Sequence, residues 1–339
     1  MHSADRTVTQ HIKAGPVFAG RTPTVPKRSR MRLNSGTVSF TKAGSGPAVL
    51  LIHGLGSTSQ TWRHLLPGLA RTHTVIAPDL PGHGRSGPPA GGFSLGAHAC
   101  TMRDLLLTLG FSRVSIIGHG LGGGVALQSA YQFPERIERV ALISGGGLGA
   151  DVAPILRAAA LPGADKVVAA LSAVPAGLTQ RLFAILPILI GHSDGNVLAG
   201  TLRRLTDDYQ RQAFLQTART ITDWHRQSMG AHCQLGLLSE VPMLFAWGAD
   251  DKAVLPIHHR AFARRVRHAI TVEIADAGHY PHETAPAQVL SALQTFLAAT
   301  QPFRYVEDHW VRRLVCAEPI GVGPEPLRKA PASDELVTT

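Results

Sequence analysis

The chain of 339 residues carries 33 Lys and Arg against 23 Asp and Glu, which gives a formal net charge of +10. Its 44% hydrophobic content is enough for a sizeable core and excludes a largely disordered protein. Three cysteines, Cys100, Cys233 and Cys316, are too few and too scattered for a disulfide framework, and no Cys/His spacing typical of zinc occurs.

Much of the positive charge lies at the start of the chain, where residues 1–32 hold seven bases and one acid. This segment has a single aromatic residue, Phe18, and lacks the basic face interleaved with aromatics that nucleic-acid binders show. We therefore predict a disordered basic leader over residues 1–34 and no nucleic-acid partner. The leader has no apolar core of secretory type, and no stretch reaches the roughly 18–20 apolar residues of a membrane helix. We expect a cytoplasmic protein without stable membrane insertion.

Strand and helix patterns alternate along the rest of the chain. Short apolar or alternating runs predict strands, and stretches with apolar residues on one side predict helices. The expected strands are 37–41, 47–52, 74–78, 114–117, 140–143, 241–247 and 270–274, and the expected helices are 95–109, 121–131, 257–267 and 285–298. Such βα units predict an α/β fold with a doubly wound, mostly parallel sheet.

Residues 147–239 interrupt this rhythm. They are rich in Ala, Leu and Arg, show no buried-strand run and are divided by prolines into short helical stretches. We predict a helical lid here, inserted into a core made of residues 35–146 and 240–300, with a C-terminal extension over 301–339. The apolar lid, most apolar at 182–190, favours a small hydrophobic molecule as the partner. The oligomeric state has no sequence signal.

Open α/β sheets place their chemistry in the loops that follow the strands. The first such loop, His53-Gly54-Leu55-Gly56, can point a backbone N–H at a developing oxyanion. The second, Asp79–Ser86, is rich in Gly and Pro, and we interpret Asp79 and His83 as bracing a rigid turn.

The third loop has the spacing of a nucleophile elbow, Gly-x-Ser-x-Gly between a strand and a helix. Both flanking glycines are present, at Gly118 and Gly122, but the central position is Gly120. A glycine-rich turn before a helix can also bind phosphate, yet the spacing does not match the dinucleotide pattern Gly-x-Gly-x-x-Gly.

Two further loops carry an acid and a base. Asp250 and Asp251 follow the strand ending at Trp247, and an acid in this place can orient a histidine. His279 follows the last strand and is a candidate general base. Elbow, acid and histidine occur in the chain order of the triad of α/β-hydrolases.

On these motifs, residues 35–300 resemble the α/β-hydrolase superfamily, most of all the lid-bearing bacterial hydrolases that cleave esters or carbon–carbon bonds of small molecules. Glu283 and Pro286, downstream of His279, are part of the resemblance. It implies Asp251 as the triad acid, with Asp250 a weaker candidate, and His279 as the base. It also implies that the N–H groups of Leu55 and Leu121 form the oxyanion hole that binds substrate, and that no metal or other cofactor is needed.

The resemblance places Gly120 at the position of the nucleophile, where glycine has no side chain to attack a carbonyl. Ser57 and Ser59 lie nearby in sequence but would have to shift to replace it. Three hypotheses remain open: a serine hydrolase inactivated by a change at residue 120, direct acid–base chemistry by His279 and Asp251 on a water or a substrate proton, and a non-catalytic scaffold that binds a small ligand.

Overall fold

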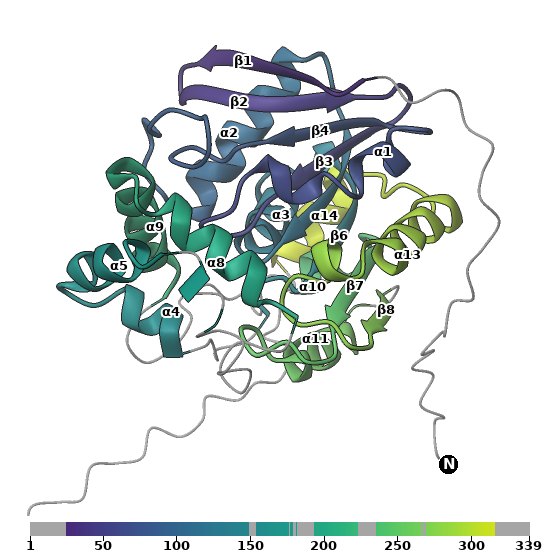
Figure 1. Ribbon diagram of the computed structural model, residues 1–339. Helices are drawn as coiled ribbons and strands as arrows, with labels where there is room; N and C mark the ends of the chain where they lie inside the picture. The colour runs from purple at the N-terminus through teal and green to yellow at the C-terminus, as the bar shows by residue number, and fades with distance from the viewer. Residues whose placement is uncertain are drawn as a thin grey trace, which may run out of the picture.

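The computed structural model describes residues 25–148, 154–175, 177–178, 181, 193–222, 235–264, 266 and 269–315. Within them lies one eight-stranded sheet of order β1-β2-β4-β3-β5-β6-β7-β8 (Figure 1). The strands β3 to β8 run parallel, whereas β2 pairs antiparallel with both β1 and β4. The strands are β1 (Lys27–Leu33), β2 (Gly36–Ala43), β3 (Ala48–Ile52), β4 (Thr74–Pro78), β5 (Val114–His119), β6 (Ile137–Ile143), β7 (Met243–Gly248) and β8 (Ala269–Ile274).

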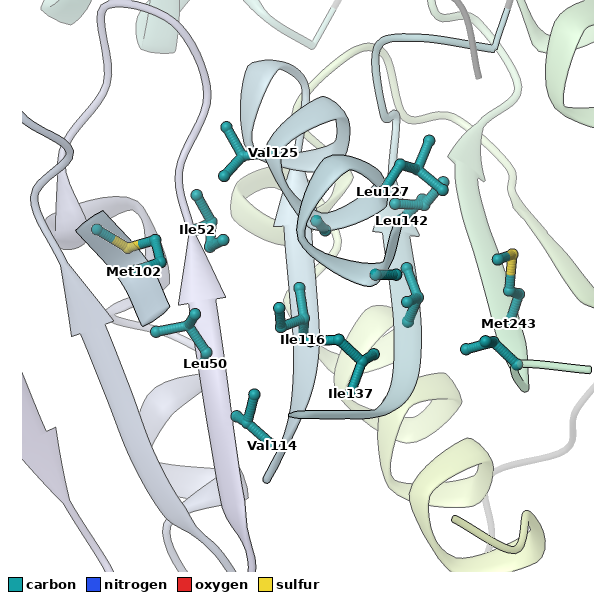
Figure 2. Packing of buried hydrophobic residues seen from close by; sticks show 14 of the residues in the cluster. Leu50, Ile52, Met102, Val114, Ile116, Val125, Leu127, Ile137, Leu142 and Met243 are labelled. Atoms are coloured by element: carbon teal, nitrogen blue, oxygen red, sulfur yellow. The ribbon is translucent and has the colours of Figure 1, made fainter. Parts of the chain in front are cut away.

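Helices cover both faces of the sheet, so the central strands β3 to β7 are mostly buried and mostly apolar. Along β3, Leu50 and Ile52 pack with α2 and α3 on one face (Figure 2), while Val49 and Leu51 pack with α1 and α13 on the other. The described helices outside the β6–β7 connection are η1 (Ser59–Trp62), α1 (Leu66–Leu69), α2 (Leu95–Thr108), α3 (Leu121–Gln132), η2 (Pro134–Arg136), α11 (Pro256–Ala263), α12 (Pro281–Thr284), α13 (Pro286–Ala299) and α14 (Glu307–Val315). The predicted doubly wound, mostly parallel fold is confirmed.

In the part of the chain that the structure describes, five helices lie between β6 and β7. The last, α10 (Leu235–Leu238), directly precedes β7. We call the other four the inserted helices, and they gather on one side of the molecule (Figure 1): α4 (Pro154–Ala159), α5 (Ala164–Ser172), α8 (Gly195–Arg204) and α9 (Asp208–Ile221). They contact loops that follow three different strands. Arg204 Nε donates to Gly56 O at 3.1 Å, Gln210 exchanges two hydrogen bonds with Gly84, and Asp194 contacts the loop after β8. This placement is consistent with the predicted lid. The apolar run 182–190 lies outside the described residues.

The boundaries predicted for the two tails need correction. The predicted disordered leader, residues 1–34, is wrong for residues 27–33, because these form β1 in register with β2. Residues 1–24 lie outside the described part. At the other end, residues 301–315 belong to the folded body: Phe303 N donates to Glu138 O at 2.9 Å, and Phe303 and Trp310 join the core.

Two further expectations can be compared with the described residues. Cys100, in α2, is a free thiol, while Cys233 and Cys316 lie outside them. No helix in the described part of the chain is long and apolar enough to cross a bilayer.

Candidate active site

The turn from β5 into α3 has the geometry of an elbow. Gly120 caps α3 at its N-terminus with φ 51° and ψ −117°, a conformation that residues with a side chain rarely adopt. A Cβ on Gly118 would lie 2.1 Å from Gly122 O, and one on Gly122 would lie 2.1 Å from Ile52 O. Backbone atoms therefore enforce glycine at both flanking positions, as the motif predicts.

Gly120 itself has different surroundings. A Cβ built on it would lie 3.4 Å from Nε2 of His279 and 3.7 Å from Cα of Gly54, which is ordinary van der Waals contact. A side chain here would therefore point at the imidazole of His279. The structure brings the expected nucleophile position and the expected base together, although they are far apart in sequence.

The other ring nitrogen of His279 meets the expected acid. Its Nδ1 lies 3.0 Å from Oδ2 and 3.2 Å from Oδ1 of Asp251. The Asp251 side chain is 0% exposed and that of His279 is 14% exposed, so only the histidine can reach a bound molecule. Oδ1 of Asp251 also accepts the N–H groups of Ala253 and Val254, both at 2.9 Å. Asp250, the weaker candidate, pairs instead with Lys252 at 2.7 Å.

The hydrogen bond to Asp251 fixes which nitrogen carries the proton. In the neutral ring Nδ1–H donates to Asp251, which leaves Nε2 as an acceptor that faces position 120. Burial lowers the pKa of His279, but the charge of Asp251, the hydrogen bond to it and the charge of Asp194 together raise the pKa above its ordinary value. His279 is therefore a base of increased strength.

The loop after β3 is held by His53 rather than by a reactive group. Nε2 of His53 accepts the N–H of Leu80 at 2.9 Å, and its Nδ1 lies 2.8 Å from Gly54 O. Gly54 O also accepts the N–H of Ser57 at 3.1 Å. These bonds fix the backbone around Leu55. Leu121 is the first residue of α3, and the first N–H groups of a helix have no acceptor within the helix.

The Asp79–Ser86 turn is braced internally, as interpreted from its composition. The Asp79 carboxylate accepts the N–H of Ser59 at 2.7 Å and that of Arg85 at 3.0 Å, and Ser86 Oγ donates to Asp79 O at 2.6 Å. Ser59 is tied into this network, since its Oγ also accepts from Arg28 at 3.2 Å. It is thus a structural residue and no substitute for a nucleophile.

His279 packs against a group of aromatic side chains formed by His119, Tyr280 and His282. The ring of His119 lies 4.8 Å from that of His279 and 4.4 Å from that of His282, measured between centroids, and Tyr280 lies beside both His119 and His279. His119 Nε2 lies 2.9 Å from His279 O, and His282 Nε2 lies 2.7 Å from Thr61 Oγ1. Burial lowers the pKa of His282 to about 3, so this ring is neutral. Glu283 accepts from Thr61 and Arg63 close by, and Pro286 starts α13.

Sequence reasoning missed two residues of the site. Asp194 and Ser193, just before α8, hydrogen-bond to the backbone of residues 278 to 280. They come from the inserted segment and match no motif, so no sequence signal pointed to them. Within the described residues no group of three or more His, Cys, Asp or Glu side chains is arranged to hold a metal.

A parallel sheet with a glycine elbow, a buried acid and a histidine at its carboxyl edge defines an α/β-hydrolase type of architecture. Comparison with known families agrees, since residues 47–286 match the family described as alpha/beta hydrolase fold. The chain belongs to this family.

Individual relatives agree with this assignment. An uncharacterized protein of Mycobacterium tuberculosis is 40% identical over 79% of this chain and 80% of its own length. The magnesium-chelatase 30 kDa subunit of Rhodobacter capsulatus is 31% identical over 72% of this chain and 84% of its own. Among solved structures, the 2-hydroxy-6-oxo-6-phenylhexa-2,4-dienoate hydrolase from Rhodococcus sp. strain RHA1 is similar in fold, with a TM-score of 0.66 and 21% identity over 81% of this chain and 99% of that one.

Proposed function

We propose that the protein hydrolyses a small hydrophobic ester, or a related acyl or carbon–carbon bond, without a covalent intermediate. In this proposal His279, oriented by Asp251, activates a water molecule that occupies the space left by the missing side chain of Gly120. Leu55 and Leu121 supply the N–H groups that stabilise the developing oxyanion.

One observation carries the proposal: Nε2 of His279 lies 3.4 Å from the position of a Cβ on residue 120, while its Nδ1 is bound to a carboxylate that is fully buried. A water at hydrogen-bond distance from Nε2 would stand near the place of a serine hydroxyl. A buried acid beside a histidine of raised pKa supports a role in proton transfer rather than in packing alone.

The reaction then runs in two proton steps. The water oxygen attacks the carbonyl carbon while Nε2 takes one of its protons, and the carbonyl oxygen becomes an oxyanion held by the two N–H groups. As the tetrahedral species collapses, the imidazolium returns the proton to the leaving alkoxide and an acid and an alcohol are released. Removal of the serine from a serine hydrolase costs about 10⁶-fold in kcat and leaves roughly 10³–10⁴-fold over water, so we expect slow turnover.

Steady-state hydrolysis of short-chain p-nitrophenyl esters by the unmodified chain tests this function. We expect slow, linear product release with no burst, and a kcat/KM that rises with pH through a midpoint above the ordinary histidine value of 6.5. His279→Gln and Asp251→Asn should each lower kcat by about 10²-fold or more, since both remove the activated base. Rates that are unchanged in both variants would exclude the proposal.

A second candidate function is that of a small-molecule binder, and the missing side chain at Gly120 is the observation that favours it. A pure binder does not need the His279–Asp251 pair. In that case a hydrophobic ligand that co-purifies with the protein should bind without turnover, and His279→Ala should leave its affinity unchanged. Mass spectrometry of the purified protein would identify such a ligand.

A further inference from the structure

The residues just before α8 reach the loop that carries His279. Both oxygens of Asp194 accept backbone N–H groups there, from His279 at 2.6 Å and from Tyr280 at 3.3 Å. Ser193 Oγ accepts the N–H of Gly278 at 2.8 Å. Three consecutive amides of the loop after β8 are thus bound by two side chains from the insertion between β6 and β7.

The Asp194 side chain binds the loop after β8 instead of its own helix. It stands at the N-cap of α8, where an Asp side chain ordinarily accepts an N–H of its own helix, but it makes no such bond. The residue is 1% exposed, and a Cβ on Gly278 would lie 2.3 Å from Asp194 Oδ2. The carboxylate therefore gives up its usual role as a helix cap and packs directly against the loop of the base.

The charged groups that face His279 are two acids. Asp251 binds its Nδ1, and Asp194 binds its backbone N–H, and both charges raise the pKa of the imidazole. The other titratable neighbours are held neutral, because burial lowers the pKa of His119 and His282 and raises that of Tyr280. The positive charge of the half-buried Arg204 lowers the pKa of Tyr280, but burial has the larger effect. Burial raises the pKa of Asp194 as well, while His279 and the two backbone N–H groups lower it.

From this geometry we propose that Asp194 is a positioning residue, one that fixes the backbone of His279 and places a second carboxylate beside the His279–Asp251 pair. The catalytic part of the proposal rests on the proposed function, whereas the electrostatic part does not require turnover. Since Asp194 comes from the inserted segment, the base is complete only while that segment lies against the loop after β8. A bound molecule that displaced the inserted helices would weaken the base.

NMR titration of the histidine side chains in the full-length protein tests this. The resonance of His279 is identified by its loss in His279→Gln. Asp194→Asn keeps the shape of the side chain and removes its charge, so we expect a lower pKa for His279 than in the unmodified chain. Two controls should leave this pKa in place. Ser193→Ala removes the acceptor of Gly278 N–H and the donor to Asp194 Oδ1 but keeps the charge of Asp194, and Asp207→Asn removes the acid that caps α9.

An unchanged His279 pKa in folded Asp194→Asn would overturn the proposal, as would an equal decrease in Ser193→Ala, which would indicate mere loosening of the loop. If Asp194→Asn fails to fold, the unmodified chain still decides: the amide resonances of His279 and Tyr280 should shift together as Asp194 titrates, and their constancy with pH would overturn the proposal. None of these measurements depends on ester hydrolysis. They can therefore contradict the role of Asp194 without contradicting the proposed function, and the ester assay can do the reverse.

Discussion

At the scale of single residues, different physical constraints act on the three glycines of the elbow, Gly118, Gly120 and Gly122. Gly118 and Gly122 approach backbone oxygens so closely that no Cβ can be accommodated. A Cβ at position 120 would make only ordinary van der Waals contacts. The remaining obstacle to a side chain there is the positive φ, which costs a residue with a Cβ about 1–3 kcal/mol. Position 120 is therefore the one place in the turn where a side chain can be restored.

Gly120→Ser should convert the site into a serine hydrolase. We expect unfolding to become easier by about 1–3 kcal/mol because of the backbone strain, together with a gain of activity toward activated short-chain esters and covalent labelling by a fluorophosphonate. Thermal unfolding measures the loss of stability, a p-nitrophenyl ester assay measures the gain of activity, and intact-mass spectrometry measures the labelling.

Gly120→Ala is the control for this change, since it adds the same strain without a hydroxyl. It should lose as much stability and remain unlabelled. A Gly120→Ser protein that is folded but inert toward both ester and fluorophosphonate would refute the hypothesis of a dormant triad.

At the scale of elements, the order of strands and helices followed from the sequence because hydrophobic periodicity and turn residues are local signals. The Gly120, Asp251 and His279 positions also followed, because loops after parallel strands meet at one edge of the sheet. Among the elements that the sequence did not predict are β1 and α14. β1 is rich in Arg and Lys because it is an edge strand with exposed positions, and α14 carries charged residues in both its first and its last turn.

The elbow can be tested as an element through Gly118→Ala. The added Cβ would meet Gly122 O at 2.1 Å, and we expect a loss of about 3 kcal/mol or more in the free energy of unfolding, because backbone must move. Urea denaturation measures this. Gly91→Ala is the matched control: its Cβ would meet only Ala97 Cβ, at 3.7 Å, and stability should stay within about 0.5 kcal/mol. Equal stability of the two variants would contradict the packing described for the elbow.

The helix α14 can be tested in the same way. Trp310 is 7% exposed and belongs to the main core cluster, so Trp310→Ala should cost about 3 kcal/mol of stability. Val311, its neighbour in the same helix, is 48% exposed, and Val311→Ala should cost little. Chemical denaturation of the two variants side by side decides whether residues 301–315 belong to the cooperative fold. A negligible effect of Trp310→Ala would show that they do not.

At the scale of the whole molecule, the interior holds several histidines that must stay neutral. Burial lowers the pKa of His83 and His282 to about 3 and that of His98 and His259 to about 4, against 6.5 for an ordinary histidine. Between these values the unfolded chain binds more protons than the folded one. These groups therefore leave the free energy of unfolding unchanged above pH 6.5, where they are neutral in both states, and lower it as the pH falls from 6.5 toward 4.

We accordingly expect the melting temperature to decrease steadily from pH 7 to pH 4.5, with each buried histidine contributing about 1.4 kcal/mol per pH unit. His279 acts in the opposite sense, because its pKa is raised. Thermal unfolding across this range, in buffers of equal ionic strength, measures the slope. His282→Gln should flatten it and His64→Gln, at an exposed position, should not. A melting temperature independent of pH would contradict this account.

The open position at Gly120 also bears on which acceptors could compete with water in the proposed reaction. An enzyme that carries an acyl group on a serine can pass it to any alcohol or amine that enters afterwards. In the proposed reaction no acyl group is transferred to the protein. The attacking oxygen must therefore already lie between Gly120 and His279 when the bond of the substrate breaks. Added methanol would divert product only if it fits in place of water there, so formation of the methyl ester would show that this space admits a molecule larger than water.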